Sequence, residues 1–396
     1  MSHFLDHAAT TPMRRAAREA WLEATGRLAT GEWGNPSSLH AGGRAARAAV
    51  EDARERIAAA LGAHPTEVIF TAGATEANNL AIKGWFWGAG GEPAAIITTA
   101  VEHHSALDPG RWLAREQRAR LSEVGTGPDA RISTEDVATM LDEVLDSGDG
   151  MRALISVQWV NNETGAIQPL TDVVALAQAM GVPVHSDAAQ AVAHLRVDFA
   201  SSGLTTMAVS AHKVGGPVGT GALLARRDAR LAPVEHGGGQ ERSLRSGTVD
   251  VAGAIAFAAA LEETVAARDA ERTRLAALRD RLAAGIDAAI HDVYITAPAD
   301  PDAWAPHIVH AIIPGAPSEA LLFLLDQAGI EASSGSACTA GVVDASHVAL
   351  AMGYDAVRAA QTLRLSLGHT STDADVDAVL AVLPDAVAKA RASVGG

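Results

Sequence analysis

One lysine stands where its amine could take part in chemistry. Only three lysines occur among the 396 residues, Lys83, Lys213 and Lys389, and Lys213 follows a short apolar run. An amine at the ligand-binding edge of a sheet can form a Schiff base with an aldehyde. Asp187 precedes Lys213 by 26 residues and follows another predicted strand, where a carboxylate can keep a pyridinium nitrogen protonated. A pyridoxal phosphate (PLP) site needs this order of Asp and Lys, although a surface lysine and a helix-capping aspartate are the alternatives.

The single cysteine, Cys338, is the second chemical candidate. One cysteine excludes an intramolecular disulfide and a zinc site made of cysteines alone. The surrounding residues 333–339 are rich in Ser and Gly, which favours a mobile loop that can carry a thiol from one group to another. A small buried hydrophobe is the alternative role for a lone cysteine.

Further polar residues follow predicted strands. Ala74 and Thr75 follow a glycine at the start of a helix, where free backbone N–H groups can bind a phosphate. His103 and His104 follow the next strand. One of them could stack on an aromatic cofactor, and we expect no metal because no third ligand lies at a recognisable spacing. Asn162 lies in a turn that could hydrogen-bond a ring hydroxyl, but each of these segments could also be an ordinary cap or turn.

An alternation of strands and helices must position these candidates. Predicted strands cover residues 67–71, 94–99, 153–160, 182–185, 207–210 and 222–225, with helices between them such as 133–145. This alternation predicts an α/β fold with a mostly parallel, doubly wound sheet. Ligands of such sheets bind beyond the carboxyl ends of the strands, which is where the candidate residues lie.

A second pattern follows a long helical region at residues 251–290. Predicted strands then cover 293–296, 308–313, 330–333 and 363–366, with helices at 318–328 and 373–391. We therefore expect a large domain over residues 15–256. Residues 1–14 and 257–396 would form a smaller α+β domain that carries the Cys338 loop.

Composition limits the class of protein. The chain is 48% hydrophobic and 20% charged, as in soluble globular proteins. Its longest apolar stretch, residues 252–261, is about half of what a membrane span needs. The first twelve residues lack the basic start and apolar centre of a secretory signal, so we expect a cytoplasmic enzyme. The net charge of −16 argues against general nucleic-acid binding.

Taken together, these segments resemble the class V aminotransferase fold, which is fold type I of the PLP-dependent transferases. They are most similar to its cysteine desulfurases of the nitrogen-fixation and iron–sulfur-cluster type. The resemblance spans nearly the whole chain, and it is carried by residues 4–12, 34–40, 69–84, 102–103, 161–165, 187–190, 210–213, 237–242, 245–248, 333–339 and 363–368.

This resemblance implies a role for individual residues. Lys213 would hold PLP covalently, and His103 would stack on its ring and help to move protons. The other cofactor contacts would come from Asp187 at the pyridine nitrogen, from Gln190 and Asn162 at the ring hydroxyl, and from Ala74, Thr75, Ser210 and His212 at the phosphate. Thr248 would reach the phosphate of the neighbouring subunit of a homodimer. Arg364, with Asn162, would bind the substrate, and Cys338 would be the nucleophile.

The implied reaction removes sulfur from L-cysteine, releases L-alanine and leaves a persulfide on Cys338. An iron–sulfur scaffold or another sulfur carrier would accept that sulfur. The chain departs from its relatives at Pro306-His307, where they usually have Pro-Asn, and at residues 314–317. The sequence ends at Gly396 without the extended tail that some relatives use to dock a scaffold, which leaves the acceptor open.

Two other classes of function are alternatives. One is another PLP reaction on the same fold, namely an aminotransferase, an epimerase or a selenocysteine lyase. The other is a non-catalytic binding protein built on a nucleotide-binding sheet. The sequence does not give the pKa of Cys338, the selectivity for cysteine over selenocysteine, or whether a cluster binds through Cys338.

Overall fold

The computed structural model describes residues 2–393 with nine internal exceptions. These exceptions are Ala89, Glu92, Gly148, Asp149, Ser336, Ala337, Ala340, Gly341 and Asp344. For Cys338, Thr339, Val342 and Val343 the backbone alone is described. Within the described ranges, no helix combines the length and apolar character that crossing a bilayer requires.

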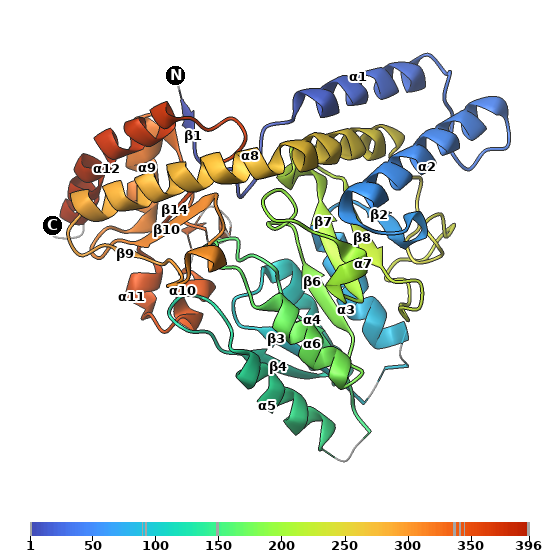
Figure 1. Cartoon of the computed structure of the whole chain (residues 1–396), viewed down its shortest axis with the longest axis horizontal. Coiled ribbons are helices and arrows are strands. Elements are labelled where there is room, and N and C mark those ends of the chain that lie inside the picture. Colours follow the sequence, from blue (N-terminus) through green and yellow to red (C-terminus); the bar gives the residue numbers. More distant parts are fainter. Residues whose placement is uncertain are drawn as a thin grey trace.

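A seven-stranded sheet forms the centre of the described structure (Figure 1), in the order β2-β8-β7-β6-β5-β3-β4. Its strands are β2 (Val68–Thr71), β3 (Ala94–Thr99), β4 (Arg120–Val124), β5 (Arg152–Ser156), β6 (Val184–Asp187), β7 (Thr206–Ser210) and β8 (Gly221–Ala225). Strand β8 runs antiparallel to both of its neighbours, and the other pairs are parallel. The predicted α/β fold with a mostly parallel sheet is confirmed.

In the central sheet, two strands differ from their predicted bounds by more than one residue, and one strand was not predicted. Strand β5 ends at Ser156. Val157 and Trp159 still donate to backbone carbonyl oxygens of β6, but Val160 pairs with Ile167 across a turn. Strand β6 extends to Asp187, so this carboxylate stands on the last residue of the strand. Strand β4 is an edge strand that contains three polar residues among five and is fully buried only at Val124. It therefore lacks the continuous apolar run that is typical of inner strands.

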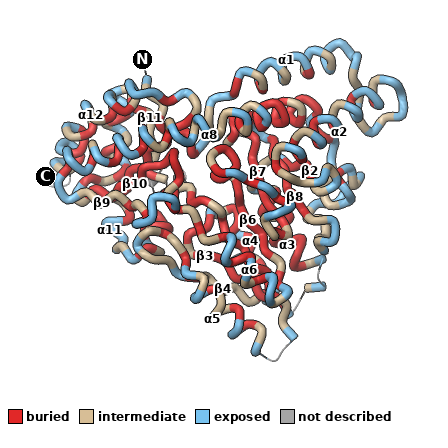
Figure 2. Tube along the Cα trace, in the orientation of Figure 1, coloured by how far each residue is buried: buried red, intermediate tan, exposed pale blue. Residues whose placement is uncertain are grey.

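Helices cover both faces of the sheet. The buried side chains of α2 (Ala41–Leu61), α5 (Thr134–Leu145) and α6 (Leu170–Ala179) pack on one face with Val68 and Phe70 of β2. The other face carries α3 (Ala74–Gly88) and α4 (His104–Gln117), and there α3 packs on Ile69. Successive strand residues point to opposite faces, so both faces of the inner strands are buried (Figure 2).

A second, smaller group of elements has its own buried cluster. Its sheet has the order β14-β10-β9, all antiparallel, formed by β9 (Tyr294–Ile295), β10 (Ile308–Ile312) and β14 (Thr362–Ser366). Helices α9 (Ser318–Gln327) and α12 (Asp373–Ala392) pack on it. The N-terminal strand β1 (His3–Phe4) pairs in parallel with β11 (Ile330–Glu331), so the first residues of the chain join this group.

Helix α8 (Val251–Ala289) joins the two groups (Figure 1). Its first residues, up to Leu261, belong to the cluster of the large sheet, and residues from Leu275 onward belong to the cluster of the small one. The remaining elements are α1 (Arg15–Ala29), which lies along α8, and α7 (Phe199–Ser202), α10 (His347–Ala351), α11 (Ala356–Ala359) and the antiparallel pair β12 (Cys338–Thr339) and β13 (Val342–Val343).

Candidate active site

A cavity of about 800 Å³ lies beyond the carboxyl ends of the central strands, which is a volume typical of small-ligand sites. Ten of the predicted site residues line it: Ala74, Thr75, His103, Asn162, Asp187, Gln190, Ser210, His212, Lys213 and Arg364. They come from strand ends far apart in sequence. The fold therefore brings together the residues that the sequence singled out one strand at a time.

Lys213 ends a short 3-10 turn that follows strand β7. Its Nζ donates to the carbonyl oxygen of Ala9 at 2.8 Å and to that of Ala8. Burial and the charge of Arg364 lower the pKa of the Lys213 amine to about 8. A larger fraction of this amine is neutral near pH 7 than for an exposed lysine, and only the neutral amine is nucleophilic.

Asp187 is anchored by a buried amide network. Its Oδ1 accepts from the backbone N–H of Ala189 at 2.9 Å, and its Oδ2 accepts from Asn78 Nδ2 at 2.7 Å. Asn78 is fully buried, and its Oδ1 lies 3.0 Å from Nε2 of His185. Burial lowers the pKa of His185 to about 4, so His185 is neutral and donates through Nε2. The carboxylate is thus held in place by neutral donors.

His103 caps helix α4, and its contacts determine its tautomer. Its Nδ1 accepts from the backbone N–H of Ser105 at 3.1 Å and lies 2.7 Å from the Ser105 hydroxyl. A backbone N–H can only donate, so Nδ1 carries no proton in the neutral ring. Burial lowers the pKa of His103, which Asp187 only partly opposes. The neutral imidazole therefore carries its proton on Nε2, the nitrogen left for a ligand.

Arg364 reaches the cavity from strand β14 of the small sheet. Its Nη1 donates to the carbonyl oxygen of Asn162 at 2.9 Å, and its Nη2 donates to Asp6 Oδ1 at 2.7 Å. The side chain is buried, and its Nε has no hydrogen-bond partner among the described residues. A buried guanidinium with an unused N–H is suited to binding a carboxylate.

The opposite end of the cavity offers donors for an anion. Helix α3 begins at Ala74, and the N–H groups of its first turn have no acceptor within the helix. Thr75, Ser210 and His212 line the same cavity. Together with the Lys213 amine and the Asp187 carboxylate, this donor set fits a group with a phosphate, an aldehyde and a pyridine nitrogen, as PLP has.

The comparison with known proteins agrees with this geometry. The model of the class-V aminotransferase family matches residues 3–379. The chain belongs to this family. The IscS-like cysteine desulfurase of Mycobacterium tuberculosis is 52% identical over 391 residues, which cover 98% of this chain and 97% of that protein. The cysteine desulfurase NifS of Azotobacter vinelandii is 36% identical over 389 residues, covering 98% and 93%.

Solved structures give the same result. A NifS-like protein from Rickettsia africae superposes with a TM-score of 0.85 at 26% identity, covering 98% of this chain and 99% of that one. Within the class-V family the chain is therefore a member of the IscS and NifS group of cysteine desulfurases. The family as a whole implies PLP, and the predicted family and fold are confirmed.

Two of the twelve predicted site residues are not among the ten that line this cavity. Thr248 is exposed and lines a separate cavity of about 60 Å³, although Arg245 borders both cavities. The side chain of Cys338 lies outside the described residues, and its backbone belongs to β12. The roles of both residues stay predictions. In the described part of the chain, no three His, Cys, Asp or Glu side chains are grouped as metal ligands.

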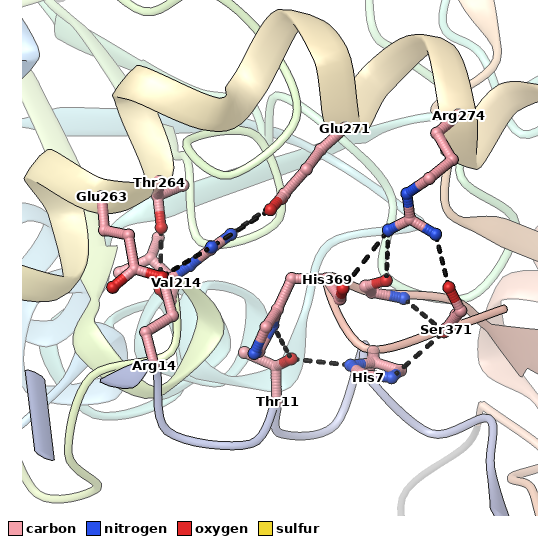
Figure 3. A network of polar contacts seen from close by, with 11 residues as sticks. His7, Thr11, Arg14, Val214, Glu263, Thr264, Glu271, Arg274, His369 and Ser371 are labelled. Atoms are coloured by element: carbon pink, nitrogen blue, oxygen red, sulfur yellow. Dashed lines mark hydrogen bonds and ion pairs between the residues drawn. The ribbon is translucent and has the colours of Figure 1, made fainter. Parts of the chain in front are cut away.

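The N-terminal segment contributes contacts that sequence reasoning did not assign. It brings Asp6 to Arg364 and the Ala8 carbonyl to Lys213. Figure 3 shows how the segment is held: Arg14 donates to both carboxylate oxygens of Glu271 on helix α8, at 3.1 and 2.8 Å. The motif at residues 4–12 was the available signal, but nothing in it indicates the partners.

Three buried polar residues near the cavity were also missed. Asn78 lies in the segment 69–84 that carries the resemblance but has no predicted role, although a polar residue on the buried face of α3 was a usable signal. Burial raises the pKa of Glu102 to about 8 and that of Glu163 to about 7. Each follows a strand next to a predicted site residue, and both carboxyls hold a proton at neutral pH more readily than ordinary glutamates do.

Proposed function

We propose that this protein uses PLP to take sulfur from L-cysteine, releasing L-alanine and leaving a persulfide on Cys338. The observation that carries the proposal is the convergence of the Lys213 amine, the Asp187 carboxylate and the Arg364 guanidinium on one cavity. Its relatives named as cysteine desulfurases match almost the whole chain, which supports the same chemistry here.

The proposed cofactor site uses the donors described above. Lys213 holds the aldehyde carbon, Asp187 holds the pyridine nitrogen, and Gln190 and Asn162 reach the ring hydroxyl. The phosphate contacts are Ala74, Thr75, Ser210 and His212. When bound, PLP withdraws electrons from the α-carbon of an amino acid and so acidifies its α-proton.

Substrate recognition depends on Arg364. The L-cysteine carboxylate meets the unused N–H of Arg364 and competes with Asp6 for its guanidinium. Asn162 supports this arrangement, because its backbone carbonyl oxygen accepts a hydrogen bond from Nη1 of Arg364 at 2.9 Å. An amino acid bound in this way presents its α-carbon to the cavity.

Lys213 and His103 carry out proton transfer. Once the amino group of the substrate replaces the Lys213 amine, that amine is free to take the α-proton, and its lowered pKa of about 8 suits this task near neutral pH. The carbonyl groups of Ala8 and Ala9 orient it through hydrogen bonds. His103 presents Nε2–H as a donor to the bound molecule.

Sulfur transfer belongs to Cys338. Its thiolate attacks the substrate sulfur, so an S–S bond forms as the C–S bond breaks. The electron pair of the C–S bond stays with carbon, which takes up a proton and leaves as alanine. The products are alanine and a Cys338 persulfide, whose sulfur passes to an iron–sulfur scaffold or another carrier protein.

The same proposal includes the assembly. Residues 15–256 form a large domain, and residues 1–14 with 257–396 form a small one. The two separate buried clusters, with Leu5 in the second, support two domains, and the first cluster extends along α8 to Leu261, past the proposed boundary. Thr248 is exposed and reaches the phosphate site of a second copy, so the protein acts as a homodimer in the cytoplasm.

A product analysis tests the function. Purified protein with PLP and L-cysteine should yield alanine and a persulfide on Cys338 in equal amounts in a single turnover. Cys338→Ser should still bind cysteine, with the expected change in cofactor absorbance. Its alanine output should fall by several orders of magnitude, because a hydroxyl is a poor nucleophile toward sulfur. Alanine formation by Cys338→Ser at near-parent rates would instead indicate another PLP reaction, and a comparison of cysteine with selenocysteine separates the lyase alternative.

A further inference from the structure

Behind the cavity, a buried imidazole contacts one of the predicted cofactor residues. His307 precedes strand β10, and its Nε2 lies 3.2 Å from Oε1 of Gln190. Gln190 Nε2 donates to the carbonyl oxygen of Ala8 at 2.8 Å. His307 is 1% exposed and Gln190 is 7% exposed, so water does not substitute for either contact.

The donor and acceptor roles in this chain follow from Ala8. A carbonyl oxygen can only accept, so the amide nitrogen of Gln190 must face Ala8, and its oxygen must face His307. His307 therefore donates through Nε2–H. Its Nδ1 is buried without a hydrogen-bond partner among the described residues, which suits the unprotonated nitrogen of a neutral ring, because a second buried N–H would lack an acceptor.

A neighbouring ring keeps His307 neutral and in place. His194 stacks on it with ring centroids 3.6 Å apart and ring planes 15° from parallel. Two protonated imidazoles at this separation would repel each other strongly. Burial, together with His194, lowers the pKa of His307 well below its usual range. His307 is thus a fixed neutral donor.

The fixed amide has one hydrogen left. One N–H of Gln190 is bonded to Ala8, and the side chain also lines the cavity. We propose that His307 is a positioning residue that holds the Gln190 amide so that it offers N–H, and not C=O, to an anionic ring oxygen of the cofactor. This inference rests on the proposed PLP function. An asparagine at position 307 also carries an N–H donor, so the donor is the feature that matters.

The cofactor spectrum gives the test. In the full chain loaded with PLP, a donor from Gln190 stabilises the deprotonated ring oxygen, which absorbs at longer wavelength than the protonated form. His307→Leu should shift the ratio of the two forms roughly tenfold toward the protonated one, the scale of one hydrogen bond to a charged group. His307→Asn should restore the parent ratio.

A matched control removes another buried histidine of the same strand region. His310 is as buried as His307 but bonds Thr296, with Nδ1 2.8 Å from its hydroxyl, and does not contact Gln190. His310→Leu should leave the spectrum unchanged. A parent-like spectrum in PLP-loaded His307→Leu, or an equal shift in His310→Leu, would overturn the inference.

A second measurement separates this inference from the proposed function. Histidine ¹⁵N NMR of the cofactor-free full chain should show a ring with Nε2 protonated and Nδ1 unprotonated, a signal that His307→Asn removes. The opposite tautomer would overturn the inference even if His307→Leu does not fold. Failure of the protein to take up PLP, with this tautomer present, would instead count against the proposed function alone.

Discussion

Two buried carboxylates of this molecule, Asp187 and Glu241, are held in different ways. Glu241 forms a two-point ion pair with Arg54, with both N–O distances 2.7 Å, and accepts from the backbone N–H of Phe70 at 2.9 Å. Asp187 accepts from two neutral N–H groups, and no Arg or Lys among the described residues forms an ion pair with it. Glu241 has its ion-pair partner within the protein, whereas Asp187 has none among the described residues and lines the cavity.

This difference separates a region that stabilises the fold from a region that serves activity. The Arg54–Glu241 pair links helix α2 to the segment after β8 and also holds strand β2, because Arg54 donates to the carbonyl oxygen of Val68 at 2.8 Å. The cavity, in contrast, is lined by polar groups that can bind a ligand. Substitutions in the first region should therefore lower stability, and those in the second should lower activity.

The largest expected effect is on activity. Lys213→Ala removes the amine that binds the cofactor and takes the proton, so alanine formation should fall by roughly 10⁴-fold or more, with little change in thermal stability. Lys83 lies over the Trp112 ring at 4.7 Å, and Lys389 pairs with Asp385 at 2.7 Å, so neither replaces it. Borohydride trapping of PLP on either of them would contradict the site.

The second effect is on stability. Glu241→Ala removes the buried partner of Arg54 and leaves only the exposed Glu51, at 3.1 Å, as its ion-pair partner. The free energy of unfolding should therefore drop by about 3 kcal/mol. Denaturant titration measures this change, and activity per folded molecule should stay near the parent value. The double variant Arg54→Met with Glu241→Leu should recover much of the loss. If Glu241→Ala lost activity without losing stability, the division into a stabilising region and a catalytic region would be wrong.

A third buried carboxyl, that of Glu163, predicts an effect of pH on stability. Glu163 is buried, accepts from the Ser346 hydroxyl at 2.5 Å, and has a pKa raised to about 7 by burial. Between its unfolded pKa and this value the folded state binds more protons than the unfolded state, so this group lowers stability as pH rises through that window.

Glu163→Gln should remove that loss. The free energy of unfolding of Glu163→Gln, measured relative to that of the parent, should rise by about 2 kcal/mol between pH 5 and pH 8. Chemical denaturation at both pH values measures this difference. Glu135→Gln, at an exposed position in the first turn of α5, is the control and should show little change. A constant offset between Glu163→Gln and the parent would mean that burial does not shift this carboxyl.

The smallest expected effect concerns His103. Ser105→Ala removes the hydroxyl next to Nδ1 but keeps the backbone N–H that determines the tautomer. The variant loses the contact with His103 Nδ1, a hydrogen bond of about 1 kcal/mol, so kcat should fall roughly fivefold while KM stays unchanged. It also loses the hydrogen bond that Asn78 Nδ2 donates to this hydroxyl at 2.8 Å, but Asn78 keeps its bond to Asp187. Steady-state kinetics measure kcat and KM separately. A change in KM alone would show that His103 serves binding and not proton transfer.

Much of the fold could be predicted from local pattern. The inner strands are apolar on both faces, and the predicted ranges 94–99, 207–210 and 222–225 match β3, β7 and β8 within one residue. The edge strand β4 could not be predicted in this way, because four of its five residues are only partly buried and three of the five are polar. The end of β5 depended on a turn that pairs Val160 with Ile167.

For the site, residue types and their spacing were enough to identify side chains that could do chemistry. A rare lysine, a carboxylate before it and a histidine after another strand end were visible because strand ends share one edge of a parallel sheet. The tertiary structure alone decided what these groups contact. Asp6 and Ala8 lie roughly 200 residues or more from the residues they hold, and no local pattern encodes such a meeting. Burial then decided which groups keep or lose protons, since only packing removes water from Lys213 and Glu163.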